Sequence, residues 1–168
     1  ELAAAEIPVV GPLALQLAPA AREQVALSGD PPTLAHCMGQ RYSVSPRRAG
    51  RAPELEDASA LAWIGRFIAR MHAVGVTRPF AHRGRLDTET YGRGPRDFLL
   101  ENDWLPPEAL PTWRAAIDTA LGEVQRAFDS LPGLRTLRLH GDCHPGNILW
   151  SDAGPHFVDL DDAITGPA

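Results

Sequence analysis

The clearest indication of fold and chemistry is the sequence HGDCHPGNILW at residues 140–150, followed by FVDLDDA at residues 157–163. A polar loop built around two glycines leads into a short apolar run, and Asp142 and Asn147 lie in this loop. Asp159 lies within the second apolar run, where a carboxylate is costly unless it is paired or binds a metal. We therefore expect these polar groups to meet at one site.

The alternation of apolar and polar residues after the loop predicts a β-hairpin. Residues 147–150 and 156–160 are expected to be its strands, and residues 151–154 its four-residue connection. Such a turn brings the start of the first strand beside the end of the second.

The register of this hairpin raises a difficulty. If Trp150 pairs with Pro155, then Asn147 pairs with Val158, and Asn147 and Asp159 face opposite sides of the hairpin. They can share a ligand only if a bulge interrupts the ladder or if both residues lie outside it.

The residue types in this constellation suit phosphoryl transfer. Carboxylate and amide oxygens are ligands for a hard cation such as Mg²⁺. A second carboxylate, not used on the metal, can accept the proton of an attacking hydroxyl group. Transfer of a phosphoryl group from ATP needs this division between a metal and a base.

Two amphipathic helices are predicted upstream. Asp57 is a good N-cap for the first, which Gly75 should end, and Pro111 should open the second. We expect the apolar face of each helix to be buried in the core. In the first helix this face consists of Leu61, Ile64, Ile68 and Met71, and in the second of Trp113, Ile117, Leu121, Val124 and Phe128.

The remaining segments give weaker signals. Residues 18–32 are rich in Ala, Pro and Gly and predict a loop or hairpin, and residues 84–95 are expected to be irregular. Residues 41–45 alternate and predict a short strand.

Composition excludes several classes of protein. The 168 residues are 44% hydrophobic and 22% charged, with a net charge of −5, which argues against a nucleic-acid partner. No apolar run approaches the roughly 18 residues of a membrane span, and no signal peptide is evident. Cys37 and Cys143 form no disulfide framework, so we expect a cytoplasmic protein, and a monomer.

The motifs resemble the catalytic segment of the aminoglycoside phosphotransferase and choline kinase superfamily, which has a protein-kinase-like fold. The resemblance rests on His-Gly-Asp, then Asn, then an Asp after a short hairpin. LRLHGDCHPGNILW, HFVDLDDA, RYSVSPRRAGR and IGRFIARMHAVG together are similar to bacterial stress-response serine/threonine kinases of this fold.

The resemblance implies a role for each loop residue. It makes Asp142 the catalytic base and Asn147 and Asp159 the Mg²⁺ ligands. His140 would brace the backbone near the metal site. The cofactors implied are ATP and Mg²⁺, and the acceptor would carry a hydroxyl group, as a protein serine or threonine does.

The resemblance also implies an α+β fold that is divided into two lobes. Residues 1–46 would be a remnant of the N-lobe with the hinge strand, and residues 47–168 a partial, mainly helical C-lobe carrying the catalytic loop and truncated at its C-terminus. The hinge residues Tyr42, Val44 and Ser45 would contact the adenine.

One feature departs from the family pattern. Kinases of this fold use a lysine in the N-lobe to hold the ATP phosphates, whereas all sixteen basic residues here are arginine. We therefore expect a fragment from which most of the N-lobe is missing, and we expect the 168 residues alone to be inactive.

Three other functions remain open at this point. The acceptor could be a small molecule such as an amino alcohol or aminoglycoside. His140, Asp142, His144 and Asp159 could instead form a metal-dependent hydrolase site. A non-catalytic, pseudokinase-like binding module is the third alternative.

Overall fold

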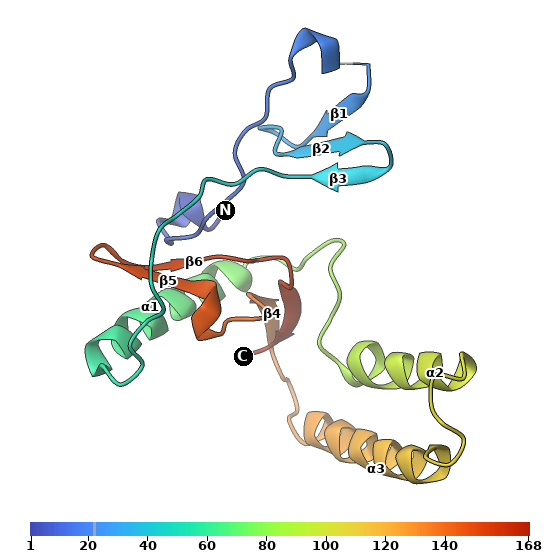
Figure 1. Cartoon of the computed structure of the whole chain (residues 1–168). Coiled ribbons are helices and arrows are strands. Elements are labelled where there is room, and N and C mark those ends of the chain that lie inside the picture. The colour runs from blue at the N-terminus through green and yellow to red at the C-terminus, as the bar shows by residue number, and fades with distance from the viewer. Residues whose placement is uncertain (22) are drawn as a thin grey trace. The chain divides into compact units, whose positions relative to one another are not determined.

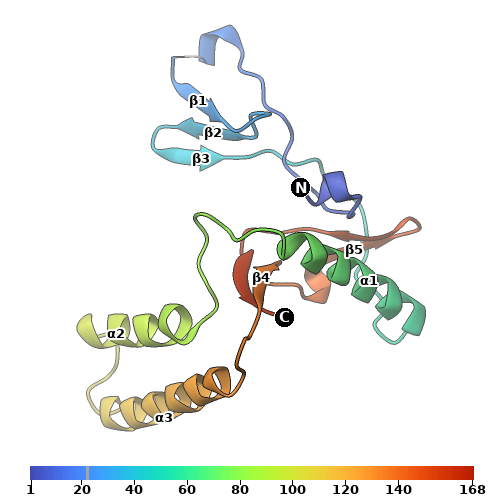
Figure 2. The same ribbon diagram turned by 180° about the vertical axis from the view of Figure 1, so that it is seen from behind.

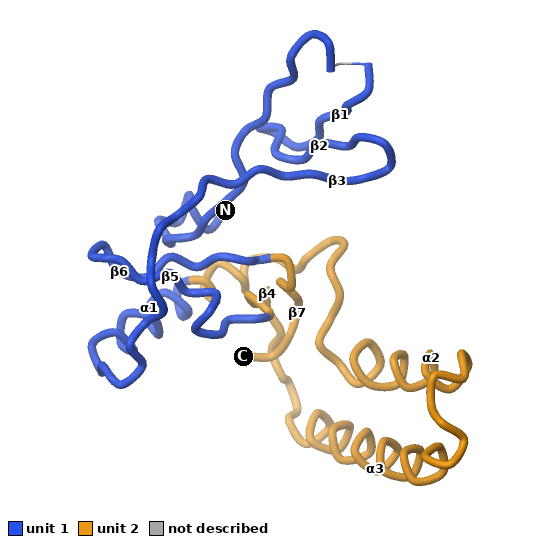
Figure 3. Tube along the Cα trace, in the orientation of Figure 1, with its two compact units in different colours: residues 1–70, 142–160 blue, residues 71–141, 161–168 orange. Residues whose placement is uncertain are grey.

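The computed structural model describes residues 1–21 and 23–168 and divides them into two compact units (Figure 3). Unit 1 comprises residues 1–70 and 142–160, and unit 2 comprises residues 71–141 and 161–168. Both contain helices and antiparallel strand pairs (Figure 1), which agrees with the predicted mixed class. The division into lobes near residue 46 remains a prediction.

Unit 1 contains a three-stranded antiparallel sheet of order β1-β2-β3. The strands are β1 (Val25–Ser28), β2 (Leu34–Cys37) and β3 (Gln40–Tyr42). The segment 18–32, which was predicted to be a loop or hairpin, contains β1 and most of the turn that leads to β2, and its residue Arg22 lies outside the described residues. The strand predicted for residues 41–45 is wrong in its bounds, because the ladder ends at Tyr42. Beyond it, the carbonyl oxygen of Val44 accepts a hydrogen bond from the Leu13 amide at 2.7 Å.

The predicted hairpin of unit 1 forms with the expected register. Strands β5 (Ile148–Ser151) and β6 (Gly154–Phe157) pair antiparallel, with Trp150 opposite Pro155. The first strand begins one residue later than predicted, after Asn147, and the second begins earlier and ends at Phe157, so the connection is shorter than the four residues expected. Phe157 is fully buried, and its backbone also bonds the N-terminal segment at Pro8 and Val10.

Helix α1 (Ala58–Gly75) has the predicted bounds. Its first turn is capped by Asp57, whose Oδ1 accepts a hydrogen bond from the Ser59 amide at 2.8 Å. The stripe is buried at Ile64 and Met71 but exposed at Leu61, so the predicted core face is correct only in part. At Gly75 a Cβ atom would lie 2.3 Å from the carbonyl oxygen of Arg138, so only glycine allows this approach to the next strand.

Unit 2 contains a strand pair that joins distant parts of the sequence. Strand β4 (Thr136–Leu139) pairs antiparallel with β7 (Ile164–Pro167), and Leu139 lies opposite Ile164. The sequence did not indicate β7, because ITGP is short and carries a glycine and a proline. Its burial, with Ile164 only 6% exposed, comes from tertiary packing.

The prediction that residues 84–95 are irregular is wrong from Glu89 onward. A π-helical turn, η3 (Glu89–Arg93), continues into helix α2 (Gly94–Glu101). Proline is tolerated here because it occupies the first turn of α2. Gly92 is required by packing, since a Cβ atom there would lie 2.4 Å from Leu121 Cδ2.

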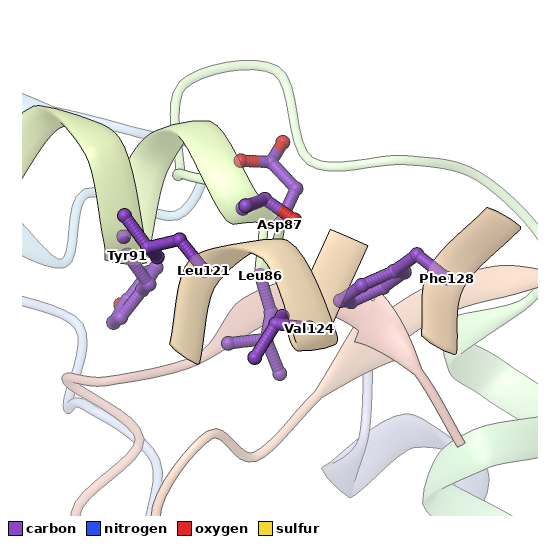
Figure 4. Close-up of a pocket in the computed structure, with 8 residues that line it drawn as sticks. Leu86, Asp87, Tyr91, Leu121, Val124 and Phe128 are labelled. Atoms are coloured by element: carbon purple, nitrogen blue, oxygen red, sulfur yellow. The ribbon is translucent and has the colours of Figure 1, made fainter. Parts of the chain in front are cut away.

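Helix α3 (Leu110–Asp129) is the second predicted helix, and it lies beside α2 in both views (Figures 1 and 2). Arg96 of α2 pairs with Asp118 of α3 at 2.8 Å. The predicted core stripe is buried at Leu121 but 43% exposed at Val124. Residues 86–92, which precede α2, and the residues Leu121, Val124 and Phe128 of α3 line an apolar cavity of about 260 Å³ (Figure 4).

No helix in the described part of the chain is long and apolar enough to cross a lipid bilayer.

Asp87 caps the first turn of η3. Its Oδ1 accepts a hydrogen bond from the Thr90 amide at 2.7 Å, and its carbonyl oxygen accepts one from the Tyr91 amide at 3.1 Å. The bond from the Thr90 amide is the main reason that the pKa of the Asp87 carboxyl is lowered, and nearby Arg85 acts in the same direction. A carboxyl group with a lowered pKa in the folded protein contributes stability above its unfolded pKa. That contribution is lost as the pH falls through the folded pKa.

We predict that Asp87→Ala destabilises the protein at neutral pH by about 1 kcal/mol, the usual effect of losing an N-cap. The difference in melting temperature from the wild type should shrink as the pH falls below about 4, where the unfolded carboxyl group becomes protonated. Thermal unfolding measured between pH 3 and pH 7 tests this. Asp152→Ala is the control, because Asp152 is an exposed turn residue, and a difference that is independent of pH would contradict the assignment.

Candidate functional site

The loop that follows β4 is organised around the side chain of Asn147. This residue is only 9% exposed. Its Nδ2 donates hydrogen bonds to the carbonyl oxygen of Asp142 at 2.9 Å and to Asp142 Oδ2 at 3.2 Å. Its backbone amide donates to the carbonyl oxygen of His144 at 2.9 Å. The five-residue spacing seen in the sequence therefore closes into a small ring of hydrogen bonds.

The Asp142 carboxylate is half exposed, and it receives a second polar contact. His144 Nε2 lies 3.5 Å from Asp142 Oδ2. On the other side of the imidazole, Nδ1 accepts a hydrogen bond from the Gly146 amide at 3.0 Å. This bond assigns the imidazole proton to Nε2, facing the carboxylate. His144 thus has a structural role in the loop, and Asp142 keeps an oxygen, Oδ1, for other partners.

Asn147 and Asp159 both lie outside the hairpin ladder. Asn147 is the last residue of the 3₁₀ turn η4 (Pro145–Asn147), immediately before β5. The amide of Val158 donates to the carbonyl oxygen of Asn147 at 3.0 Å, and the next residue, Asp159, has a left-handed backbone with φ of 58°. The strand ends therefore leave the regular alternation, one of the two ways in which the register problem could be resolved.

The donor set of these residues fits a hard cation. Both side-chain bonds of Asn147 use its amide nitrogen, so its amide oxygen is the atom that it can offer to a metal. Asp159 is exposed and adds a carboxylate. One or two protein oxygens are enough for Mg²⁺, which takes its other ligands from water and from phosphates.

A zinc site is not supported by the same residues. Within residues 1–21 and 23–168, no three or more His, Cys, Asp or Glu side chains are grouped so that they could hold a metal ion. The hydrolase alternative needed such a group, formed by His140, Asp142, His144 and Asp159.

His140 and Gly141, which precede this loop, belong to unit 2. His140 is 7% exposed. Gly141 has φ of 90°, and a Cβ atom there would lie 1.9 Å from the carbonyl oxygen of Asp162. Glycine is required both by the left-handed backbone and by this close approach. The sequence placed a sharp turn here, but the contact with Asp162 is visible only in the structure.

The proposed adenine contacts lie in unit 1, at and after the end of β3. Tyr42 and Val44 are about half exposed, at 51% and 52%, and Ser45 is also exposed. The Val44 carbonyl oxygen already accepts a bond from Leu13, whereas the side chains remain accessible. The nucleotide-binding role of these residues remains a prediction.

Cys143 is adjacent to the candidate base and is influenced by it. Partial desolvation of the thiol raises its pKa, and the negative charge of Asp142 raises it further. The residue as a whole is exposed. As expected from the sequence, the neighbouring carboxylate disfavours the reactive thiolate.

Comparison with known proteins identifies relatives along the whole chain. It is 37% identical over 168 residues to "Stress response kinase A" of Salmonella choleraesuis, and equally to "Serine/threonine protein kinase RdoA" of Salmonella typhimurium. It is 35% identical over 163 residues to "Stress response kinase A" of Escherichia coli K12. These alignments include 97–100% of this chain but only 44–46% of the relatives' length, so the chain spans less than half of each relative.

The model of the phosphotransferase enzyme family (APH) matches residues 1–168. This match contains both parts of the site, the loop at residues 140–147 and the hairpin that leads to Asp159. The sequence motif, the hydrogen-bonded loop and the family match agree, and the chain belongs to the phosphotransferase enzyme family.

Proposed function

We propose that the protein is an ATP- and Mg²⁺-dependent kinase that phosphorylates serine or threonine hydroxyl groups of proteins. The observation that carries this proposal is the hydrogen-bonded pair of Asp142 and Asn147, with Asp159 attached to the same hairpin end. The names of the relatives support a protein acceptor, and membership of the family supports phosphoryl transfer.

In this mechanism Asp142 is the general base. Its Oδ2 is occupied by Asn147 and faces His144, so Oδ1 is the oxygen that accepts the proton of the acceptor hydroxyl. The hydroxyl oxygen then forms a bond to the γ-phosphorus while the bond to the β,γ-bridging oxygen breaks, and ADP is released. The contacts to Oδ2 restrict rotation of the carboxylate and so orient the accepting oxygen.

Asn147 and Asp159 would hold the metal through the amide oxygen and the carboxylate. When bound, Mg²⁺ neutralises charge that develops on the transferred phosphoryl group and its leaving group. The hydrogen bonds from Asn147 Nδ2 to Asp142 fix the orientation of the amide, which directs its oxygen away from the base. The Asn147 side chain would thereby orient the Asp142 base through its nitrogen and hold the metal through its oxygen.

The domain assignment belongs to the same proposal. We assign the β1–β3 sheet and the segment up to residue 46 to the N-lobe and hinge, with Tyr42, Val44 and Ser45 contacting the adenine. Residues 47–168 form the C-lobe part that carries the catalytic loop. Cytoplasmic location and a monomeric state complete the proposal.

We predict that Asp142→Asn in the complete protein lowers kcat by about 10²-fold or more, the usual contribution of a general base. Asn147→Ala and Asp159→Asn should mainly raise the Mg²⁺ concentration that half-maximal activity needs. The assay measures transfer from γ-labelled ATP to a panel of serine- and threonine-containing proteins, and to choline and aminoglycosides.

Asp152→Asn is the matched control, because Asp152 is an exposed residue in the turn between β5 and β6. Wild-type turnover by Asp142→Asn would refute the role of the base. Transfer to the small alcohols but to none of the proteins would assign the enzyme to the small-molecule branch of the family.

The thiol of Cys143 offers an independent test of the charge on Asp142. We predict that iodoacetamide alkylates Cys143 slowly at neutral pH and faster as the pH rises, because its raised pKa leaves little thiolate. Asp142→Asn removes the nearby negative charge and should accelerate alkylation at a given pH. The measurement uses a Cys37→Ser background and mass spectrometry, and equal rates in the two proteins would show that Asp142 has no influence on the Cys143 thiol.

A further inference from the structure

The apolar cavity of unit 2 has walls that are partly exposed to solvent. Leu86 and Tyr91 line it from the segment before α2, and Leu121, Val124 and Phe128 line it from α3 (Figure 4). Leu86 is 40% exposed, Tyr91 60% and Val124 43%. Apolar side chains that gather around a cavity and remain exposed indicate a surface that another segment or molecule covers.

The size and chemistry of the cavity favour an apolar side chain as its occupant. Pockets for drug-sized ligands usually measure about 300–1,000 Å³ and hold a few polar groups that orient the ligand. This cavity measures about 260 Å³, and Asp87 is the only charged residue among the described residues that line it. The Asp87 carboxylate already accepts the Thr90 amide bond at 2.7 Å. An apolar side chain would instead gain close contacts with the walls.

Strand β7 runs beside the residues that lead into this cavity. Arg85 and Thr165 form a parallel bridge. The Leu86 amide donates to the carbonyl oxygen of Thr165 at 2.7 Å, and the Thr165 amide donates to that of Gly84 at 3.1 Å. Because the two segments run in the same direction, the chain leaving β7 follows the direction of residues 86–88, which line the cavity.

We propose that in the complete protein the segment that directly follows Ala168 covers this cavity and inserts an apolar side chain between residues 86–92 and α3. The relatives that match the chain are each more than twice as long, which leaves ample length for such a segment. A segment that precedes residue 1 is less suited, because residues 1–70 belong to unit 1. The inference does not depend on phosphoryl transfer.

Charge argues against a second copy of the chain as the occupant. Residues 86–131, which include the cavity walls, carry nine acidic side chains and four arginines. In a symmetric pair of copies these surfaces would face each other, and their like charges would repel. A segment of the same molecule does not meet this obstacle.

The first test measures, in the complete protein, how fast N-ethylmaleimide reacts with a cysteine placed in the cavity wall. The background carries Cys37→Ser and Cys143→Ser, and Val124→Cys supplies the thiol. We expect it to react at least about tenfold more slowly than Ala115→Cys, because a covered thiol reacts only when the covering segment opens. The two rates should become equal in concentrated urea.

Ala115→Cys is the matched control, because Ala115 is an exposed residue of α3 that does not line the cavity. Leu86→Cys supplies a second test position if Val124→Cys does not fold. Reaction at the test position as fast as at Ala115→Cys would overturn the inference, since the cavity would then be open in the complete protein.

A photo-cross-link identifies what covers the cavity. Tyr91→p-benzoylphenylalanine places the reactive group in its wall, and mass spectrometry maps the cross-linked peptides after irradiation of the complete protein. The expected product joins position 91 to a peptide after residue 168 within one molecule. Cross-links that join two molecules, or that reach no residue after 168, would overturn the inference. Neither measurement depends on kinase activity, so failure of the proposed function would leave both results unchanged.

Discussion

The buried amide of Asn147 is the constraint on which the site depends. A buried polar side chain must have hydrogen-bond partners, because an unsatisfied group costs about 1–3 kcal/mol. The side chain of Asn147 meets this requirement through the carbonyl oxygen and carboxylate of Asp142, and the backbone of Asn147 bonds the carbonyl group of His144 and the amide of Val158. These bonds connect the loop to the end of the hairpin. The conformation that satisfies the Asn147 side chain therefore also holds the Asp142 carboxylate beside it.

Glycine positions determine how closely segments approach one another within each unit. In unit 2, a Cβ atom at Gly141 would overlap the carbonyl oxygen of Asp162, and one at Gly75 would overlap that of Arg138. In unit 1, a Cβ atom at Gly154 would lie 2.4 Å from the Trp63 ring, next to the hairpin turn. At these three positions the packing leaves no room for a side chain.

Sequence reasoning succeeded where the signal was local. The N-cap at Asp57 and the end of α1 at Gly75 depend on neighbouring residues, and both were predicted. The pairing of Trp150 with Pro155 follows from the length of the turn. It failed where long-range packing decides: α2 forms despite Gly94 and Pro95, and β7 forms only because β4 supplies its hydrogen bonds.

Side-chain chemistry and the two-residue period of a strand are enough to predict the candidate residues, their spacing, and that Asn147 and Asp159 can share a ligand only outside the ladder or at a bulge. How they lie outside it depends on tertiary structure, in which Asn147 ends a 3₁₀ turn and Asp159 has a left-handed backbone. The contacts of Arg83 with Asp161 and Ala163 in unit 2 are likewise tertiary, because they span nearly 80 positions and no local pattern encodes partners so far apart in the chain.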